Sequence, residues 1–166
     1  LKHASASIGR SVNIDWIDSE TFNGNLNQLD NFDGVLVPGG FGTRGSEGII
    51  DTATYTLEKN IPYLGICFGF QLAAIAFGRK ICNLENANST EIIADTKNPI
   101  IDLLPEQKDE TDMGGSLRLG ANEIKINQDS LAHKIYNSDK ISKRHRHRYE
   151  FNTNYRDEFL KKGMIF

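Results

Sequence analysis

The fold is decided by the stretch IPYLGICFGFQLAAIAFGR at residues 61–79. Its first six residues form a short apolar run that predicts a buried strand, and the residues after Cys67 carry apolar side chains at helical spacing. Cys67 lies at the turn between them, with Gly65 and Gly69 two positions to either side. By its position alone, Cys67 could equally be a buried core cysteine. The two glycines favour a nucleophile elbow, because a nucleophile on a sharp strand-to-helix turn needs small neighbours.

Further segments extend this alternation of strand and helix along the chain. Residues 35–37 are a second apolar run that predicts a buried strand, and apolar positions in residues 47–59 follow helical spacing. Residues 12–17 alternate apolar and polar side chains, which predicts another strand. Short strands and loops with a helical patch at residues 130–137 are expected later. The alternation indicates right-handed βαβ units and therefore an α/β fold with an open, mostly parallel, doubly wound sheet.

A glycine-rich loop, PGGFGTRG at residues 38–45, follows the strand predicted at residues 35–37. Because the carboxyl ends of parallel strands meet at one edge of an open sheet, this loop should face the same crevice as Cys67. A glycine N–H in the loop could form an oxyanion hole together with the N–H of Phe68. An ordinary glycine-rich turn is the alternative. The loop lacks the Gly-Lys-Ser/Thr ending of a Walker A loop.

Composition and charge exclude several classes of protein. The 166 residues are 39% hydrophobic and 25% charged, which is ordinary for a globular protein, and we interpret residues 1–166 as one domain. The net charge of −3 argues against a general nucleic-acid binder. No apolar stretch suits a transmembrane helix, and no signal peptide is visible. We therefore expect no membrane partner. Because Cys67 and Cys82 form no disulfide framework, we also expect a cytoplasmic protein.

Outside the elbow, the basic run RHRHRY at residues 144–149 is a candidate binding segment. A strand here would place Arg144, Arg146 and Arg148 on one face and the two histidines on the other. Such a face could bind phosphate or RNA, although a charged edge strand that discourages aggregation is the simpler interpretation. His-x-His without a third ligand is a weak metal signal, and we expect no metal site. Cys82 lies beyond the predicted helix, and we interpret it as a core residue.

Five segments, in chain order, resemble a known family. They are PGGFG at 38–42, LGICFGFQ at 64–71, NANSTE at 86–91, GGSLRLG at 114–120 and RHRHRYE at 144–150. The first two resemble class I glutamine amidotransferases, and all five together resemble the glutamine-hydrolysing domain of the CTP synthase family. The resemblance runs along essentially the whole chain and implies the class I amidotransferase fold, which is flavodoxin-like. The family usually has Leu and Met where this sequence has Phe68 and Phe70, which exchanges one apolar side chain for another.

The resemblance implies a role for each residue of the site. Cys67 would attack the side-chain amide of glutamine, form a glutamyl thioester and release ammonia. Gly40 and Phe68 would supply the N–H groups of the oxyanion hole and contact the substrate. Arg148 would pair with the α-carboxylate of glutamine, and Glu91 would hold its α-ammonium group. The other residues expected at the substrate are Gly69, Phe70, Gln71 and Tyr149, and a loop resembling the family's lid, with a possible GTP effect, contains Arg44 and Glu47.

Cofactors and partners also follow from the resemblance. In the family, ammonia passes to a synthase domain that uses ATP and Mg²⁺ to aminate UTP to CTP, and GTP activates glutamine hydrolysis. We therefore expect L-glutamine as the substrate, no cofactor within this domain, a synthase domain as partner and a homotetramer for the full enzyme. The family's catalytic His and its orienting Glu lie in a His-Pro-Glu segment with no match in residues 1–166. We expect a domain incomplete at both ends, which by itself is inactive or weak.

Two other interpretations remain open from the sequence. A DJ-1/PfpI-type cysteine hydrolase also places a cysteine on an elbow, but that group often has His directly after the cysteine, where this sequence has Phe68. The other interpretation is a non-catalytic binding or regulatory module that kept the same scaffold. A His-Pro-Glu sequence encoded beyond Phe166 would favour the enzyme over the module.

Overall fold

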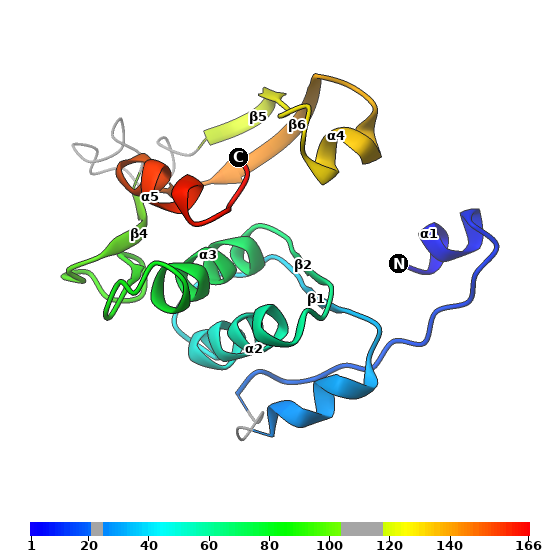
Figure 1. Cartoon of the computed structure of the whole chain (residues 1–166), viewed down its shortest axis with the longest axis horizontal. Helices are drawn as coiled ribbons and strands as arrows, with labels where there is room; N and C mark the ends of the chain where they lie inside the picture. Colours follow the sequence, from blue (N-terminus) through cyan, green and yellow to red (C-terminus); the bar gives the residue numbers. More distant parts are fainter. Residues whose placement is uncertain (21–24, 104–117) are drawn as a thin grey trace.

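The structure, a computed structural model, describes residues 1–20, 25–103 and 118–166 (Figure 1). Its helices and strands belong to the α/β class. In chain order they are α1 (Lys2–Ser7), η1 (Leu26–Asn31), β1 (Val35–Val37), α2 (Ser46–Lys59), β2 (Tyr63–Gly65), α3 (Phe68–Lys80), β3 (Asn88–Ser89), β4 (Pro99–Leu103), β5 (Arg118–Lys125), α4 (Leu131–Tyr136), β6 (Lys140–His147), β7 (Tyr149–Phe151), η3 (Thr153–Tyr155) and α5 (Arg156–Lys161). Within the three described ranges, no helix is both long and apolar enough to cross a lipid bilayer.

The centre of the fold is the β1–α2–β2–α3 unit. β1 and β2 run parallel, with Val35 opposite Tyr63 and Val37 opposite Gly65. α2 ends at Lys59, and the left-handed conformation of the next residue, Asn60 (φ 55°), terminates the helix two residues before Pro62. The order strand, helix, strand, helix predicted around Cys67 is therefore confirmed.

The described strands form three sheets, whereas the sequence led us to expect one open sheet. β1 and β2 form the first sheet, and β5 and β6 form an antiparallel ribbon. In the third sheet β4 pairs in parallel with β3 and antiparallel with β7. The α/β class is confirmed, but a single doubly wound sheet is not what the described residues form. The reason is that an apolar run identifies a strand without identifying the strand that pairs with it.

The prediction of a strand at residues 12–17 is wrong. These residues form no strand, and Trp16 is 90% exposed. Alternating side chains suit a half-buried strand, but the strand forms only where a neighbour completes its hydrogen-bond ladder. No described strand pairs with this segment. Figure 1 shows the N-terminal segment and α1 at the margin of the fold, apart from α2 and α3.

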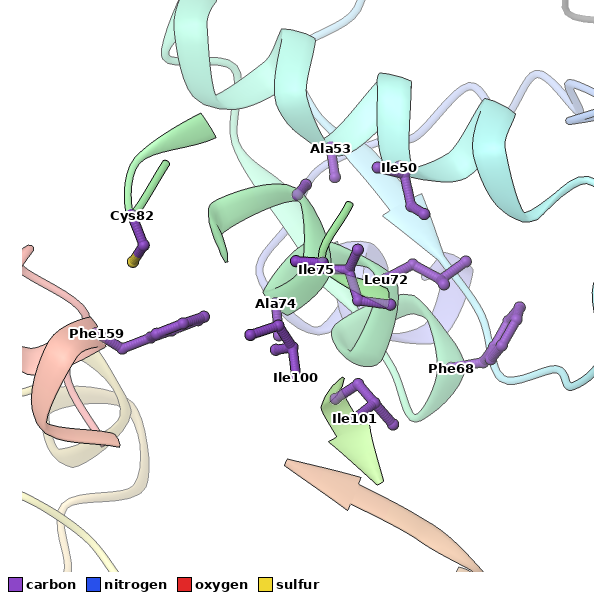
Figure 2. Packing of buried hydrophobic residues seen from close by; sticks show 12 residues of the cluster. Ile50, Ala53, Phe68, Leu72, Ala74, Ile75, Cys82, Ile100, Ile101 and Phe159 are labelled. Atoms are coloured by element: carbon purple, nitrogen blue, oxygen red, sulfur yellow. The ribbon is translucent and has the colours of Figure 1, made fainter. Parts of the chain in front are cut away.

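The core holds α3 between α2 and the three-stranded sheet. Leu72 and Ile75 of α3 are fully buried, as are Ile100 of β4 and Phe159 of α5 (Figure 2). The Phe77 and Phe159 rings pack with centroids 5.1 Å apart. Each such buried side chain stabilises the fold by about 1.5–3 kcal/mol relative to an exposed one. This packing fixes the helix whose N-terminus carries the candidate nucleophile.

Cys82 and α4 agree with the sequence predictions made for them. Cys82 is 7% exposed and belongs to the hydrophobic core, which confirms its interpretation as a core residue. Burial raises the pKa of its thiol, the Glu158 carboxylate raises that pKa further, and Lys162 opposes the shift. The helix expected at residues 130–137 is α4, in which the Ser130 hydroxyl oxygen accepts a hydrogen bond from the His133 N–H at 3.1 Å.

Candidate active site

Cys67 occupies a strained turn between β2 and α3. Its φ of 56° and ψ of −108° lie in a region that residues with a side chain rarely adopt. On the strand side, the Ile66 N–H donates to the Val37 carbonyl oxygen at 2.9 Å. On the helix side, the Gln71 N–H donates to the Cys67 carbonyl oxygen at 3.1 Å. Hydrogen bonds on both sides thus hold the turn in the geometry of a nucleophile elbow.

The two glycines that flank Cys67 are needed because three backbone segments meet at the elbow. A Cβ atom on Gly65 would lie 2.6 Å from the carbonyl carbon of Gly69, and a Cβ atom on Gly69 would collide with the carbonyl oxygen of Val37. Backbone atoms cannot rotate out of the way as the end of a side chain can. Only glycine at both positions therefore allows α3 to start so close to β1 and β2.

Tyr63 closes the elbow, a contact that the sequence did not reveal. The hydroxyl of this half-buried residue donates a hydrogen bond to the Gly69 carbonyl oxygen at 2.9 Å. Burial raises the pKa of Tyr63 well above its ordinary value, so the hydroxyl remains a neutral donor at physiological pH. The bond ties the first residue of β2 to the first turn of α3. The one signal in the sequence was a tyrosine two residues before Gly65 in an otherwise apolar strand.

The glycine-rich loop lies against the elbow, as the carboxyl-edge argument predicts. A Cβ atom on Gly39 would lie 3.9 Å from the Cys67 Sγ, and one on Gly40 would lie 3.3 Å from the Phe68 ring. Cys67 itself is half-buried. Phe68 is the first residue of α3, so its N–H is among the four that the helix leaves unpaired. A helix N-terminus at this position favours the negative charge of an oxyanion.

Glu91 reaches the same loop from the three-stranded sheet. It follows β3, and its Oε1 accepts a hydrogen bond from the Gly42 N–H at 2.9 Å. Gly42 has a φ of 84°, a left-handed conformation that favours glycine. The structure therefore connects Glu91, which the resemblance assigned to the site, with the glycine-rich loop 49 positions earlier in the chain.

Gln71 links the elbow helix to the segment that contains Arg148 and Tyr149. The Gln71 side chain is 8% exposed, and its Nε2 donates to the Tyr149 carbonyl oxygen at 2.7 Å. The Arg148 Nε is buried and has no hydrogen-bond partner among the described residues. An unpaired buried donor costs about 1–3 kcal/mol, and more where the group is charged. Arg148 is therefore suited to an anionic ligand that completes its hydrogen bonding.

The expectation that Arg148 shares a strand face with Arg144 and Arg146 is wrong. β6 ends at His147, and Arg148 lies between β6 and β7. Arg144 and Arg146 are exposed on the hairpin, whereas Arg148 is half-buried. The reason is that the chain leaves one sheet and enters another at this residue, so the two-residue alternation does not continue through it.

Three of the remaining predicted residues have other contacts. Phe70 is 42% exposed, and its side chain lines a hollow between α2 and α3. Arg44 forms an ion pair with Glu20. Glu47 bonds through both carboxylate oxygens, at 2.7 and 3.1 Å, to Arg79 in the last turn of α3, the opposite end from Cys67. Residues 114–117 of the GGSLRLG segment lie outside the described residues.

Comparisons with known proteins agree along the whole chain. The family model described as "Glutamine amidotransferase class-I" matches residues 1–166. A CTP synthase from Halalkalibacterium halodurans is 52% identical over 168 residues, covering 100% of this chain and 32% of the relative. One from Archaeoglobus fulgidus is 50% identical over 170 residues, covering 100% and 31%. The solved glutaminase domain of Trypanosoma brucei CTPS with bound acivicin superimposes with a TM-score of 0.88 at 34% identity, covering 97% of this chain and 63% of that one.

Proposed function

The chain belongs to the class I glutamine amidotransferase family, and from this premise we propose that it is the glutamine-hydrolysing domain of a CTP synthase. The resemblance found in the sequence is confirmed at the level of the family and of close similarity to CTP synthases. The chain spans about a third of the length of these curated relatives. The DJ-1/PfpI interpretation is set aside, because the family match covers all 166 residues.

The observation that carries the proposal is the contact between the elbow and the glycine-rich loop. The Cys67 thiolate attacks the side-chain amide carbon of glutamine, and the carbonyl oxygen takes up negative charge. The N–H groups of Gly40 and Phe68 then stabilise that charge. Once a general acid has protonated the amide nitrogen, collapse of the intermediate breaks the C–N bond, expels ammonia and leaves a glutamyl thioester. Water hydrolyses the thioester to glutamate and regenerates the thiol. Gly40 and Phe68 pack against each other at the elbow, which supports their assignment to one oxyanion hole.

Recognition of the amino-acid end of glutamine is assigned to Glu91 and Arg148. Glu91 carries the negative charge that the α-ammonium group needs, and Arg148 offers a planar pair of donors for the α-carboxylate. Gln71 supports this assignment, since it ties the Arg148 segment to the elbow helix through Tyr149. Gly69 and Phe70 complete the proposed substrate wall through the first turn of α3. Two opposite charges at fixed positions would select α-amino acids over simple amides.

The activity of the whole protein is part of the proposal. We propose that ammonia released at Cys67 is used by a synthase domain to aminate UTP to CTP with ATP and Mg²⁺, in a cytoplasmic homotetramer. The domain that spans residues 1–166 would need no cofactor of its own. Arg44 and Glu47 would belong to a lid through which GTP activates hydrolysis. The similarity to CTP synthases supports these proposals.

Labelling of the full-length protein with a glutamine analogue that carries an electrophilic side chain tests the proposed nucleophile. We expect the label on the peptide that contains Cys67 and none on the peptide that contains Cys82, as measured by mass spectrometry. The thiol of Cys82 is buried and its pKa is raised, so it offers little thiolate. Excess glutamine should protect Cys67. A label on Cys82, or on neither cysteine, would reject the enzyme and favour a non-catalytic module.

Removing the Arg148 guanidinium should weaken glutamine binding more than it slows the chemistry. We expect Arg148→Ala to raise the KM for glutamine by about 30–1,000-fold, which corresponds to about 2–4 kcal/mol for one partner of a buried charge pair. The KM of Arg148→Lys should lie between those of the parent and of Arg148→Ala, because an ammonium group keeps the positive charge but cannot form the bidentate contact with a carboxylate. Steady-state ammonia release by the full-length enzyme measures both the KM for glutamine and kcat.

Arg146→Ala is the matched control for Arg148→Ala, since Arg146 is exposed on β6 and should leave the KM within about twofold. 4-Aminobutanamide, which lacks the α-carboxylate, should be hydrolysed equally by the parent and the Arg148→Ala enzymes. An equal KM for glutamine in those two enzymes would remove Arg148 from the substrate site.

A further inference from the structure

The carboxylate of Glu91 has a partner within the protein before any substrate arrives. Its Oε1 accepts the 2.9 Å hydrogen bond from the Gly42 N–H. A carboxylate has two oxygens with about four acceptor positions, so the bond to Gly42 leaves Oε2 and further positions for a second donor. Glu91 can therefore hold the loop and the α-ammonium group at the same time.

The bond to Glu91 is the tie that holds the tip of the glycine-rich loop. Among the described residues, no other hydrogen bond joins residues 39–42 to the rest of the fold. The next loop residue, Thr43, is already fixed to α2, because its carbonyl oxygen accepts from both the N–H and the hydroxyl of Ser46. Phe41 is 86% exposed and adds little packing. The position of Gly40 between these points therefore depends on the bond from Gly42 to Glu91.

Glu91 is itself held in place by the three-stranded sheet. Its N–H donates to the hydroxyl of the buried Ser89 at 3.1 Å. The preceding residue, Thr90, donates its N–H to the Ile101 carbonyl oxygen at 3.0 Å and its hydroxyl to Asp102 at 2.8 Å. The carboxylate is thus attached to a fixed backbone, and the loop takes its position from the sheet.

We propose that Glu91 is a positioning residue for the oxyanion hole as well as the ligand of the substrate ammonium group. The inference rests on the proposed function. Through one carboxylate, the turn that follows β3 sets the position of Gly40 beside Phe68 at the elbow. The same Glu91 carboxylate then binds the ammonium group of the substrate and holds the loop that carries the oxyanion donor. Loss of that anchor slows the chemistry even for a substrate that has no ammonium group.

Two variants of the full-length enzyme, Glu91→Gln and Glu91→Ala, separate the two roles. Both remove the negative charge of Glu91. In Glu91→Gln, however, the introduced side chain keeps an oxygen that can accept the hydrogen bond from the Gly42 N–H. Glutaramate, which is glutamine without its α-amino group, removes the ammonium contact from the comparison. We expect kcat for glutaramate to be about tenfold lower in Glu91→Ala than in Glu91→Gln, the effect of one lost hydrogen bond.

The rate at which iodoacetamide alkylates Cys67 provides a readout besides turnover. Since Gly39 lies against the Cys67 Sγ, release of the loop should expose the sulfur and make alkylation several-fold faster in Glu91→Ala than in Glu91→Gln. Gly42→Ala should behave like Glu91→Ala, because a Cβ atom there meets nothing within 4 Å and acts only through the φ of 84°. Gly9→Ala, with a φ of 66° and equally open surroundings, is the matched control for backbone strain and should behave like the parent.

Equal glutaramate kcat values and equal alkylation rates in Glu91→Ala and Glu91→Gln would overturn the positioning role while the parent enzyme still hydrolyses glutamine. A parent enzyme that does not hydrolyse glutamine would instead overturn the proposed function, and the inference with it. Whether the parent enzyme hydrolyses glutamine therefore distinguishes a failure of the positioning role from a failure of the proposed function.

Discussion

Replacing Cys67 with alanine in the full-length enzyme is expected to lower kcat for glutamine hydrolysis by about 10⁴-fold or more. Removal of a nucleophile forfeits nearly all of the rate that depends on the covalent intermediate, because the remaining groups have no thioester to form. The half-buried sulfur at the N-terminus of α3 is the only thiol placed at the elbow in the described residues. Ammonia release in a coupled assay measures the loss.

Two controls separate loss of the nucleophile from loss of the fold. Cys82→Ala removes the second thiol, which lies in the core away from the elbow, so it should lower the free energy of unfolding by about 1 kcal/mol and keep the rate. If the proposed synthase activity is present, free ammonia supplied to the Cys67→Ala enzyme should support amination of UTP at the parent rate, since that step bypasses glutamine. A Cys67→Ala enzyme that retained glutamine hydrolysis within tenfold of the parent would refute the assignment.

Replacing Gly65 with alanine should damage both stability and catalysis. The new Cβ atom would lie 2.6 Å from the carbonyl carbon and oxygen of Gly69 and from the N of Phe70, all backbone atoms. α3 must move away from β2, and Cys67 moves with it. We expect the free energy of unfolding to fall by about 3 kcal/mol, the upper part of the range for overpacking. Since a displacement of about 1 Å can cost about 10²-fold in rate, we expect a loss of that size in kcat.

Denaturant unfolding and steady-state kinetics measure the two effects of Gly65→Ala. Gly9→Ala is the control, because Gly9 has open space around its Cα and a left-handed φ, so its substitution costs about 1–2 kcal/mol through the backbone alone. Gly65→Ala should therefore lose more stability than Gly9→Ala and should be the one variant of the pair that loses rate. Parent-like kinetics in a folded Gly65→Ala enzyme would contradict the close approach of β2 and α3.

The elements nearest Cys67 were predictable because their causes are local. An apolar run predicts β1, and helical spacing predicts α2 and α3. The glycines on either side of Cys67 also report a local cause, since each must clear the backbone of the same turn. The resemblance to the CTP synthase family supplied the roles of Glu91 and Arg148, which no local pattern contains.

Predictions that depended on distant partners were less successful. Residues 12–17 have the pattern of a strand but no described strand beside them. The alternation from Arg144 to Arg148 stops at His147, because the chain changes sheets there. Alternation of side chains shows that a segment could form a strand, whereas the strand forms only where a second segment pairs with it.

From its residues alone, this chain determines a cysteine elbow between a strand and a helix, and the family to which that elbow belongs. Only the tertiary structure decides how the surrounding site is held together. The Gly42 N–H meets Glu91 across 49 positions, and the Gln71 side chain meets the Tyr149 carbonyl across 78. Such contacts form when sheets and helices pack. The sequence around either residue does not identify its hydrogen-bond partner. Hydrophobic periodicity therefore predicts the frame, and long-range hydrogen bonds between fixed elements set the positions of the residues within it.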